Sequence, residues 1–257
     1  MDKIIHHFLN SVIAIGTPDN NNNIAWIGTG FIVSKRDSDT KETSFYIITN
    51  KHVLENIDVI CARFNTLTKD FVKDYTFKLK DRNNNFLFSK HLNDEIDILA
   101  MRFNPDNFNN DKVIWRAISL EDQSLTLNQM KNNEMLEGTI VYALGFPMSL
   151  VEDVKTPICR LGCISRIRNT YFNKDDYPTY LVDAQAYPGN SGSPIISDYK
   201  LIGILNANIT QNTILVNQQT GRPQMLLTEN SGLTYVFPVD RIKEVVDLEF
   251  NRTKKQV

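Results

Sequence analysis

The feature that most constrains the fold is the alternation of short apolar runs with clusters of asparagine. The clusters lie at residues 20–23, 83–85, 107–110 and 132–133. Asparagine side chains hydrogen-bond their own backbone and tolerate left-handed conformations, so these clusters predict turns. The runs between them have strand length and are rich in Val, Ile, Phe and Tyr. They are Ser11–Thr17, Trp26–Ser34, Ser44–Thr49, Asp58–Phe64, Tyr75–Leu79, Ile96–Phe103, Thr139–Leu144, Cys159–Ile167, Thr179–Asp183, Pro194–Ser197 and Leu201–Asn208.

About a dozen short strands with few helices predict an all-β fold. That number is too large for one small barrel and suits two packed barrels or sheets. No linker rich in Pro, Ser or Gly interrupts the chain, and no repeat of fixed period is present. Two helices are expected, a short one over Met1–Asn10 and one over Asp240–Phe250. The second places four side chains near one face, those of Ile242, Val245, Val246 and Glu249.

Composition excludes several classes of function. The 28 basic and 30 acidic residues give a formal charge of −2, without the positive excess that nucleic acid binding requires. The sequence contains no run of about 18 apolar residues, so no membrane-spanning helix is predicted. The N-terminal segment lacks the features of a secretory signal. Three cysteines (Cys61, Cys159 and Cys163) cannot all pair. We therefore expect a cytoplasmic protein with free core cysteines and neither metal nor cofactor.

A tight turn is predicted around Ser191, in the segment Tyr-Pro-Gly-Asn-Ser-Gly-Ser-Pro at residues 187–194. Two prolines and two glycines surround the serine just before an apolar strand. A hairpin connection would use such residues. A nucleophilic serine would use them too, because its hydroxyl must project while backbone N–H groups converge on the attacked carbonyl oxygen.

A nucleophilic serine also needs a base and an orienting carboxylate. Among four histidines, His52 follows an apolar strand, whereas His6, His7 and His91 are expected to be exposed. Asp97 is the one charge in the apolar run 96–101, where burial without a partner would be costly. His52 and Asp97 are therefore the candidates for the two roles.

Four segments, in this order, resemble the chymotrypsin/trypsin-like serine peptidase superfamily, and most closely its bacterial HtrA-type peptidases. They are Gly28–Val33 (GTGFIV), Ile48–Val53 (ITNKHV), Asp97–Ala100 (DILA) and Asp183–Gly192 (DAQAYPGNSG). Weaker similarity at residues 143–147 and 231–239 extends the match over roughly residues 11–250.

The resemblance implies a single peptidase domain over residues 1–257, built from two packed six-stranded β-barrels. The barrels would cover about residues 11–118 and 135–237, followed by a C-terminal helix at 238–250. It implies a serine endopeptidase acting on protein or peptide substrates. Ser191 would attack the carbonyl, His52 would transfer the proton and Asp97 would hold His52. The N–H groups of Gly189 and Ser191 would form the oxyanion hole.

Three features depart from the family pattern, and the first concerns activation. Asn190 stands where some members carry an Asp that pairs with a new N-terminus after cleavage, so we expect activation by another route. The chain would be competent as synthesised, or switched by loop movement or an activating partner. Ser193 replaces a glycine, and no PDZ domain fits after residue 250.

A neutral, polar substrate pocket is expected. Its predicted lining is Gln185, Ala186, Asn206, Ala207 and Asn208. Gln185 occupies the position where trypsins carry the Asp that selects Lys and Arg. A carboxylate such as Glu229 could still enter from the long segment 210–229.

Two alternatives to a general endopeptidase remain open. One is a partner-gated proteolytic effector with a dedicated substrate in stress or defence. The other is an inactive pseudoprotease that serves as a binding module, which the presence of all three catalytic side chains disfavours. Cleavage specificity and oligomeric state are left undetermined by the sequence.

Overall fold

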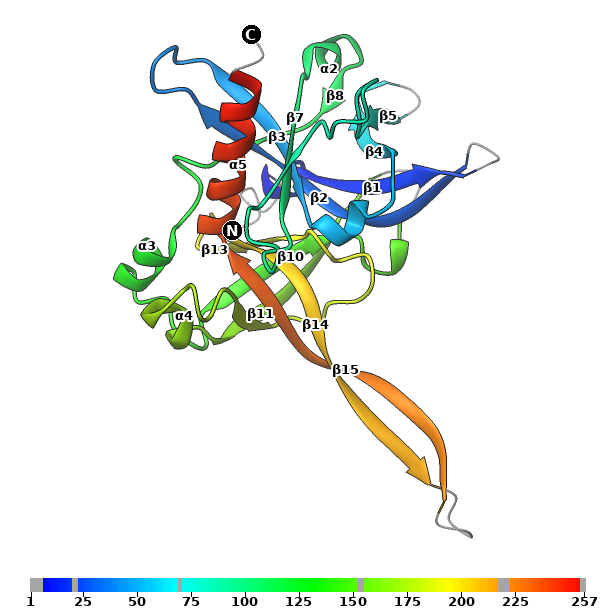
Figure 1. Ribbon diagram of the computed structural model, residues 1–257, viewed down its shortest axis with the longest axis vertical. Helices are drawn as coiled ribbons and strands as arrows, with labels where there is room; N and C mark the ends of the chain where they lie inside the picture. Colours follow the sequence, from blue (N-terminus) through cyan, green and yellow to red (C-terminus); the bar gives the residue numbers. More distant parts are fainter. Residues whose placement is uncertain (1–6, 20–22, 69–70, 152–154, 217–221, 255–257) are drawn as a thin grey trace.

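Strands dominate the computed structural model, which describes residues 7–19, 23–68, 71–151, 155–216 and 222–254 (Figure 1). The strands of the first half are β1 (Val12–Pro18), β2 (Ile24–Arg36), β3 (Thr43–Thr49), β4 (Val59–Thr66), β5 (Val72–Lys78), β6 (Ser89–Lys90), β7 (Leu99–Phe103), β8 (Val113–Ile114) and β9 (Ile118–Ser119). Those of the second half are β10 (Ile140–Gly145), β11 (Ile158–Arg166), β12 (Tyr180–Asp183), β13 (Pro194–Ser197), β14 (Lys200–Val216) and β15 (Pro223–Pro238). The helices are η1 (Lys51–Leu54), α2 (Asp106–Asn110), α3 (Leu127–Asn132), η2 (Pro147–Ser149), α4 (Arg168–Phe172) and α5 (Val239–Lys254).

The predicted fold class is confirmed, with one difference in the first half. There, nine strands form one sheet in the order β5-β4-β1-β2-β3-β7-β6, with β8 paired to β4 and β9 to β2. The ladder is an open path among the described residues, whereas a six-stranded barrel was expected. Its inner face buries an apolar cluster that includes Ile47, Phe64 and Phe103.

The second half is a closed six-stranded barrel, β10-β11-β12-β15-β14-β13, in which every pairing is antiparallel. A separate apolar cluster fills it, with Val182, Ile195 and Val236 fully buried. A third cluster joins the halves and takes in the last helix. The two halves therefore share a core between them and each has one of its own.

The C-terminal helix α5 begins within one residue of its predicted start and runs four residues past its predicted end, to Lys254. It packs along the first sheet, as the red helix beside β3 and β7 in Figure 1 shows. The predicted face is correct, since Ile242, Val245, Val246 and Glu249 are all buried. Of the expected N-terminal helix, residues 7–9 are helical and residues 1–6 lie outside the described part.

The expected core role of the cysteines is right for one of the three. Cys61 on β4 is buried, but Cys159 is exposed and Cys163 is half-buried. The last two lie on β11 in the other half, where their even spacing puts both on the outward face with the exposed Leu161. An even offset fixes a common face of the strand, and the barrel decides which face is inside.

The strand expected over Leu201–Asn208 continues to Val216 and forms a long ribbon with β15. This ribbon leaves the barrel and projects far beyond the rest of the molecule (Figure 1). No helix among the described residues is long and apolar enough to cross a membrane.

Candidate active site

His52 and Asp97 are in direct contact. His52 lies in η1, directly after β3, and Asp97 lies two residues before β7, the antiparallel neighbour of β3. The imidazole Nδ1 hydrogen-bonds Asp97 Oδ2, and the backbone N–H of His52 donates to Asp97 Oδ1 over 3.1 Å. Adjacent strand ends thus bring together two residues 45 positions apart.

The buried Asn50 holds the backbone beneath this pair. Its Nδ2 donates to the Asp97 carbonyl over 2.7 Å, and Asn50 is fully buried. Lys51 spans the same loop, donating from Nζ to the carbonyl of Asn93 over 3.2 Å. Burial lowers the pKa of Lys51, an effect that the charges of Asp94 and Asp97 oppose. Sequence reasoning missed Asn50, whose only signal was its place between a strand and His52.

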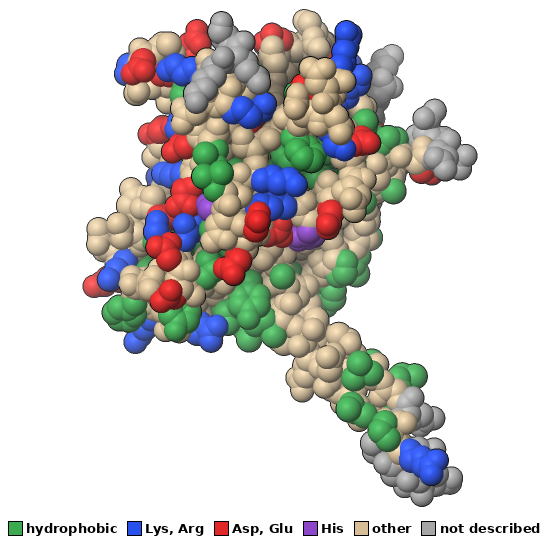
Figure 2. All heavy atoms as spheres, viewed as in Figure 1, with side chains coloured by type: hydrophobic (Ala, Val, Ile, Leu, Met, Phe, Trp, Pro, Cys, Tyr) green, Lys and Arg blue, Asp and Glu red, His purple; other side chains and the backbone are tan. Residues whose placement is uncertain are grey.

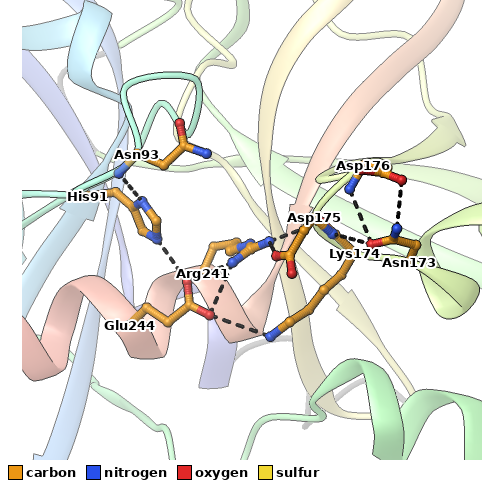
Figure 3. Close-up of polar contacts among 8 residues, drawn as sticks. All are labelled: His91, Asn93, Asn173, Lys174, Asp175, Asp176, Arg241 and Glu244. Atoms are coloured by element: carbon orange, nitrogen blue, oxygen red, sulfur yellow. Dashed lines mark hydrogen bonds and ion pairs between the residues drawn. The ribbon is translucent and has the colours of Figure 1, made fainter.

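His91 is not exposed, in contrast to the expectation. Its side chain is 9% exposed, and Nε2 contacts Glu244 Oε2 of α5 at 2.8 Å. Glu244 also accepts from Arg241, which bonds Asp175 over 2.9 Å in the second half (Figure 3). The backbone N–H of His91 donates to the carbonyl of Ile98, so this polar network fixes the segment that carries Asp97. The sequence around His91 does not indicate a partner such as Glu244, which lies 153 positions away along the chain.

Ser191 lies in the predicted tight turn, which ends the connection from β12 to β13. The N–H of Asn190 donates to the carbonyl of Tyr187 over 3.0 Å, and Gly189 has φ +94°. Gly192 has φ +87°, and a Cβ on it would lie 2.0 Å from the carbonyl oxygen of Thr29. Glycine is therefore required there by both conformation and space. Ser193 is buried and lies outside the positive-φ region, so the residue that replaces the family's glycine is unstrained.

The amide N–H groups of Gly189 and Ser191, on either side of Asn190, donate to no described residue. The carbonyl of Pro188 accepts from the N–H of Met148. Because a trans peptide is planar, the N–H of Gly189 points the opposite way from that carbonyl. An unoccupied pair of donors on either side of Asn190 is the arrangement that can bind a developing oxyanion.

Thr29 fastens the serine turn to the first half. Its N–H donates to the Ser191 carbonyl over 3.0 Å and its Oγ1 to the Gly189 carbonyl over 2.7 Å. Thr49 Oγ1 in turn donates to the Thr29 carbonyl over 2.7 Å. Thr29 belongs to the GTG part of the segment Gly28–Val33. That segment was the only sequence signal for Thr29, and no role in holding the serine turn was predicted for it.

Ser191 Oγ contacts the carbonyl of Asn206 at 3.5 Å, and no hydrogen bond joins it to His52 among the described residues. His52 and Asp97 thus stand assembled on the first half, with Ser191 held separately on the second. Catalytic hydrogen bonds are often long in free enzymes and tighten only with substrate.

The residues predicted for the pocket are partly brought together. Asn208 Nδ2 donates to the carbonyl of the buried Ala186 over 2.7 Å, and Asn206 meets Ser191. Gln185 and Ala207 are exposed, and Gln185 contacts the hydroxyl of Tyr187 at 3.5 Å. Glu229 is exposed and paired in register with Gln211 on the projecting ribbon. In the part of the chain that the structure describes, no three His, Cys, Asp or Glu side chains gather as a metal site.

The fold consists of a nine-stranded sheet, which carries His52 and Asp97, packed against a closed antiparallel barrel, which carries Ser191. This arrangement is that of the chymotrypsin-like double-barrel class. The family model of the trypsin-like peptidase domain matches residues 28–204, and the chain belongs to that family.

Among solved structures, the fold is similar to that of the HtrA-type protease AlgW with a decapeptide. The TM-score is 0.53 at 16% sequence identity, over 96% of this chain. The match covers 66% of the AlgW chain, just under two thirds of its length. No curated protein matches the chain.

Proposed function

We propose that this protein is a serine endopeptidase in which Ser191, His52 and Asp97 form the catalytic triad. The observation that carries the proposal is the contact of His52 Nδ1 with the Asp97 carboxylate, on the half that faces the serine turn. Family membership and the two unoccupied amide donors support the same assignment. The decapeptide bound to AlgW supports a peptide substrate.

In the proposed mechanism, Ser191 Oγ attacks the scissile carbonyl carbon while His52 Nε2 accepts its proton. Asp97 keeps the remaining imidazole proton on Nδ1 and stabilises the imidazolium. The N–H groups of Gly189 and Ser191 bind the oxyanion of the tetrahedral intermediate. Its collapse transfers the proton from His52 to the leaving amine and leaves an acyl-enzyme, which water hydrolyses by the same steps.

A second candidate, a partner-gated effector with one dedicated substrate, is favoured by the position of Ser191 Oγ. That hydroxyl contacts the carbonyl of Asn206 rather than His52. A substrate or partner that displaces this contact would complete the triad.

Labelling with a small fluorophosphonate, followed by intact mass, tests the assignment. We expect one adduct on the wild-type protein and none on Ser191→Ala. The matched control is Ser193→Ala, because the buried Ser193 hydroxyl has no hydrogen-bond partner among the described residues and should be dispensable. An adduct on folded Ser191→Ala would overturn the mechanism. Labelling and casein together separate the two candidates, because a general endopeptidase is labelled and degrades casein, whereas a gated effector does neither until its partner completes the triad.

A further inference from the structure

The projecting ribbon is a structure of its own, defined here as the arm, residues 209–216 and 223–230. Strand β13 pairs with β14 only as far as Ile204, and β12 pairs with β15 only from Leu233 onward. Between these limits the two strands of the arm pair with each other alone. Register shifts between Leu205 and Ala207 and between Asn208 and Thr210 increase the local twist where the ribbon leaves the barrel.

The arm exposes aliphatic side chains on both faces. Ile214 is opposite Leu226 on one face, and Leu215 is opposite Met225 on the other. Each of these four is between 44% and 61% exposed, and Figure 2 shows hydrophobic side chains along the arm. A two-stranded ribbon is at best marginally stable in water without a third strand or a covering element. Its apolar faces are therefore suited to being covered by something else.

The free edge of β14 runs from the arm directly to the serine. Asn206, where pairing with β13 has ended, directs its carbonyl to Ser191 Oγ. Eight residues separate Asn206 from Ile214, which corresponds to roughly 26 Å of strand. An unpaired strand edge is a template for an added strand. A chain added here would have its backbone at Ser191 and its distant residues against the aliphatic pairs.

We propose that the arm is an exosite, which binds an extended, aliphatic-rich segment of the protein substrate as an added strand on the edge of β14. This inference rests on the proposed function. Every pairing in the barrel is antiparallel, so the added strand also runs opposite to β14. That direction places on the arm the residues about eight positions N-terminal to the cleaved bond. Continuity of the edge with Ser191 favours substrate over a second copy of this chain as the occupant.

Two peptidyl phosphonates test the exosite. Both carry alanine next to the phosphorus. One has a short peptide, and the other extends it by about twelve residues of alternating isoleucine and threonine, enough to reach the arm. The readout is the ratio of the rates at which they phosphonylate Ser191, followed by intact mass. For the wild type we expect the extended probe to react at least ~tenfold faster, as an added strand with two apolar contacts should bind.

The double variant Ile214→Ser/Leu226→Ser removes one aliphatic pair, and we expect it to lower this ratio several-fold. Asn212→Ser/Thr228→Ser, a polar cross-strand pair two residues away, should keep the wild-type ratio. Equal rates for the two probes on the wild type, or an undiminished ratio in the aliphatic variant, would overturn the exosite. So would a wild-type oligomer that the aliphatic variant dissociates in sedimentation equilibrium, since a second copy would then cover the arm.

The failure of the proposed function has a different signature. If the small fluorophosphonate leaves Ser191 unlabelled, the assignment of a peptidase that is active without a partner fails. The arm is then tested by fluorescence anisotropy of the extended peptide without its phosphonate, on Ser191→Ala. Binding that the aliphatic variant weakens supports the arm as a peptide site, and absence of binding overturns it.

Discussion

Asp97 shows how much one residue in its context predicts. A lone carboxylate in an apolar run has to find a partner, and the structure supplies the imidazole and the backbone N–H of His52. The sequence does not reveal Asn50 or Thr29, because their roles are hydrogen bonds to backbone carbonyls rather than to other side chains. Residue type predicts chemistry well and predicts support for that chemistry poorly.

Asp97→Asn should lower the rate of fluorophosphonate labelling by roughly 10³–10⁴-fold while leaving the fold intact. An amide in this place can present an N–H to Nδ1, which moves the imidazole proton to Nε2 and removes the base that faces Ser191. Labelling kinetics measure the effect, with circular dichroism as the control for folding. A rate within threefold of wild type would contradict the role of Asp97.

At the scale of elements, strand positions follow from the sequence more reliably than strand ends. Each predicted strand overlaps an observed one, but most ends differ by one to three residues, and β14 runs eight residues past its expected end. Neither face of the arm is buried, so its sequence lacks the regular alternation of apolar and polar residues that indicates a strand. The extension of β14 into the arm was therefore not predicted. The short helices α2, α3 and α4 were not expected, and each has only five or six residues.

Helix α5 was predicted with a charged residue on its buried face, and that residue anchors the helix. Glu249 is fully buried and accepts hydrogen bonds from Ser89 Oγ, the N–H of Arg102 and the guanidinium of Arg252. Glu249→Ala should lower the free energy of unfolding by about 3 kcal/mol, because it leaves a partly buried guanidinium and an N–H unpaired. Urea denaturation measures this change.

The control for this experiment lies on the same helix. Asp247 is 55% exposed and pairs with Lys35, so Asp247→Ala should cost less than about 1 kcal/mol. Equal losses in the two variants would show that helix α5 is not anchored through Glu249.

At the scale of the whole molecule, Ser149 at the end of η2 and Lys155 before β11 join the second half to the first. Ser149 Oγ donates to the Trp26 carbonyl over 2.8 Å, and the backbone of Lys155 exchanges two hydrogen bonds with the Asn65 side chain. The Lys155 ammonium is buried and donates to the carbonyl of Val12. Periodicity could not have predicted a buried lysine, because its partner is a backbone carbonyl in the other half.

Burial lowers the pKa of Lys155 from the ordinary 10.5 to about 7. Between these values the unfolded chain binds more protons than the folded one, so the free energy of unfolding rises with pH across this window. Below pH 7 the amine is protonated in both states, and its burial lowers the free energy of unfolding by up to roughly 5 kcal/mol, at about 1.4 kcal/mol for each unit by which the pKa is lowered.

Lys155→Met should therefore stabilise the protein more at pH 6 than at pH 10. Urea denaturation at the two pH values measures the difference, with the exposed Lys131→Met as the control. The same gain at both pH values would contradict a lysine that is neutral in the fold.

The hydrogen bonds from Thr29 to the carbonyls of Gly189 and Ser191 couple the serine turn to the packing of the two halves. The proposed catalytic groups come from the two halves of the molecule, and the hydrogen bonds of Thr29 join the first half directly to the turn that holds Ser191. A displacement of one half against the other would therefore act directly on the backbone of Gly189 and Ser191. The alignment of the site therefore depends on the correct packing of the two halves of the molecule.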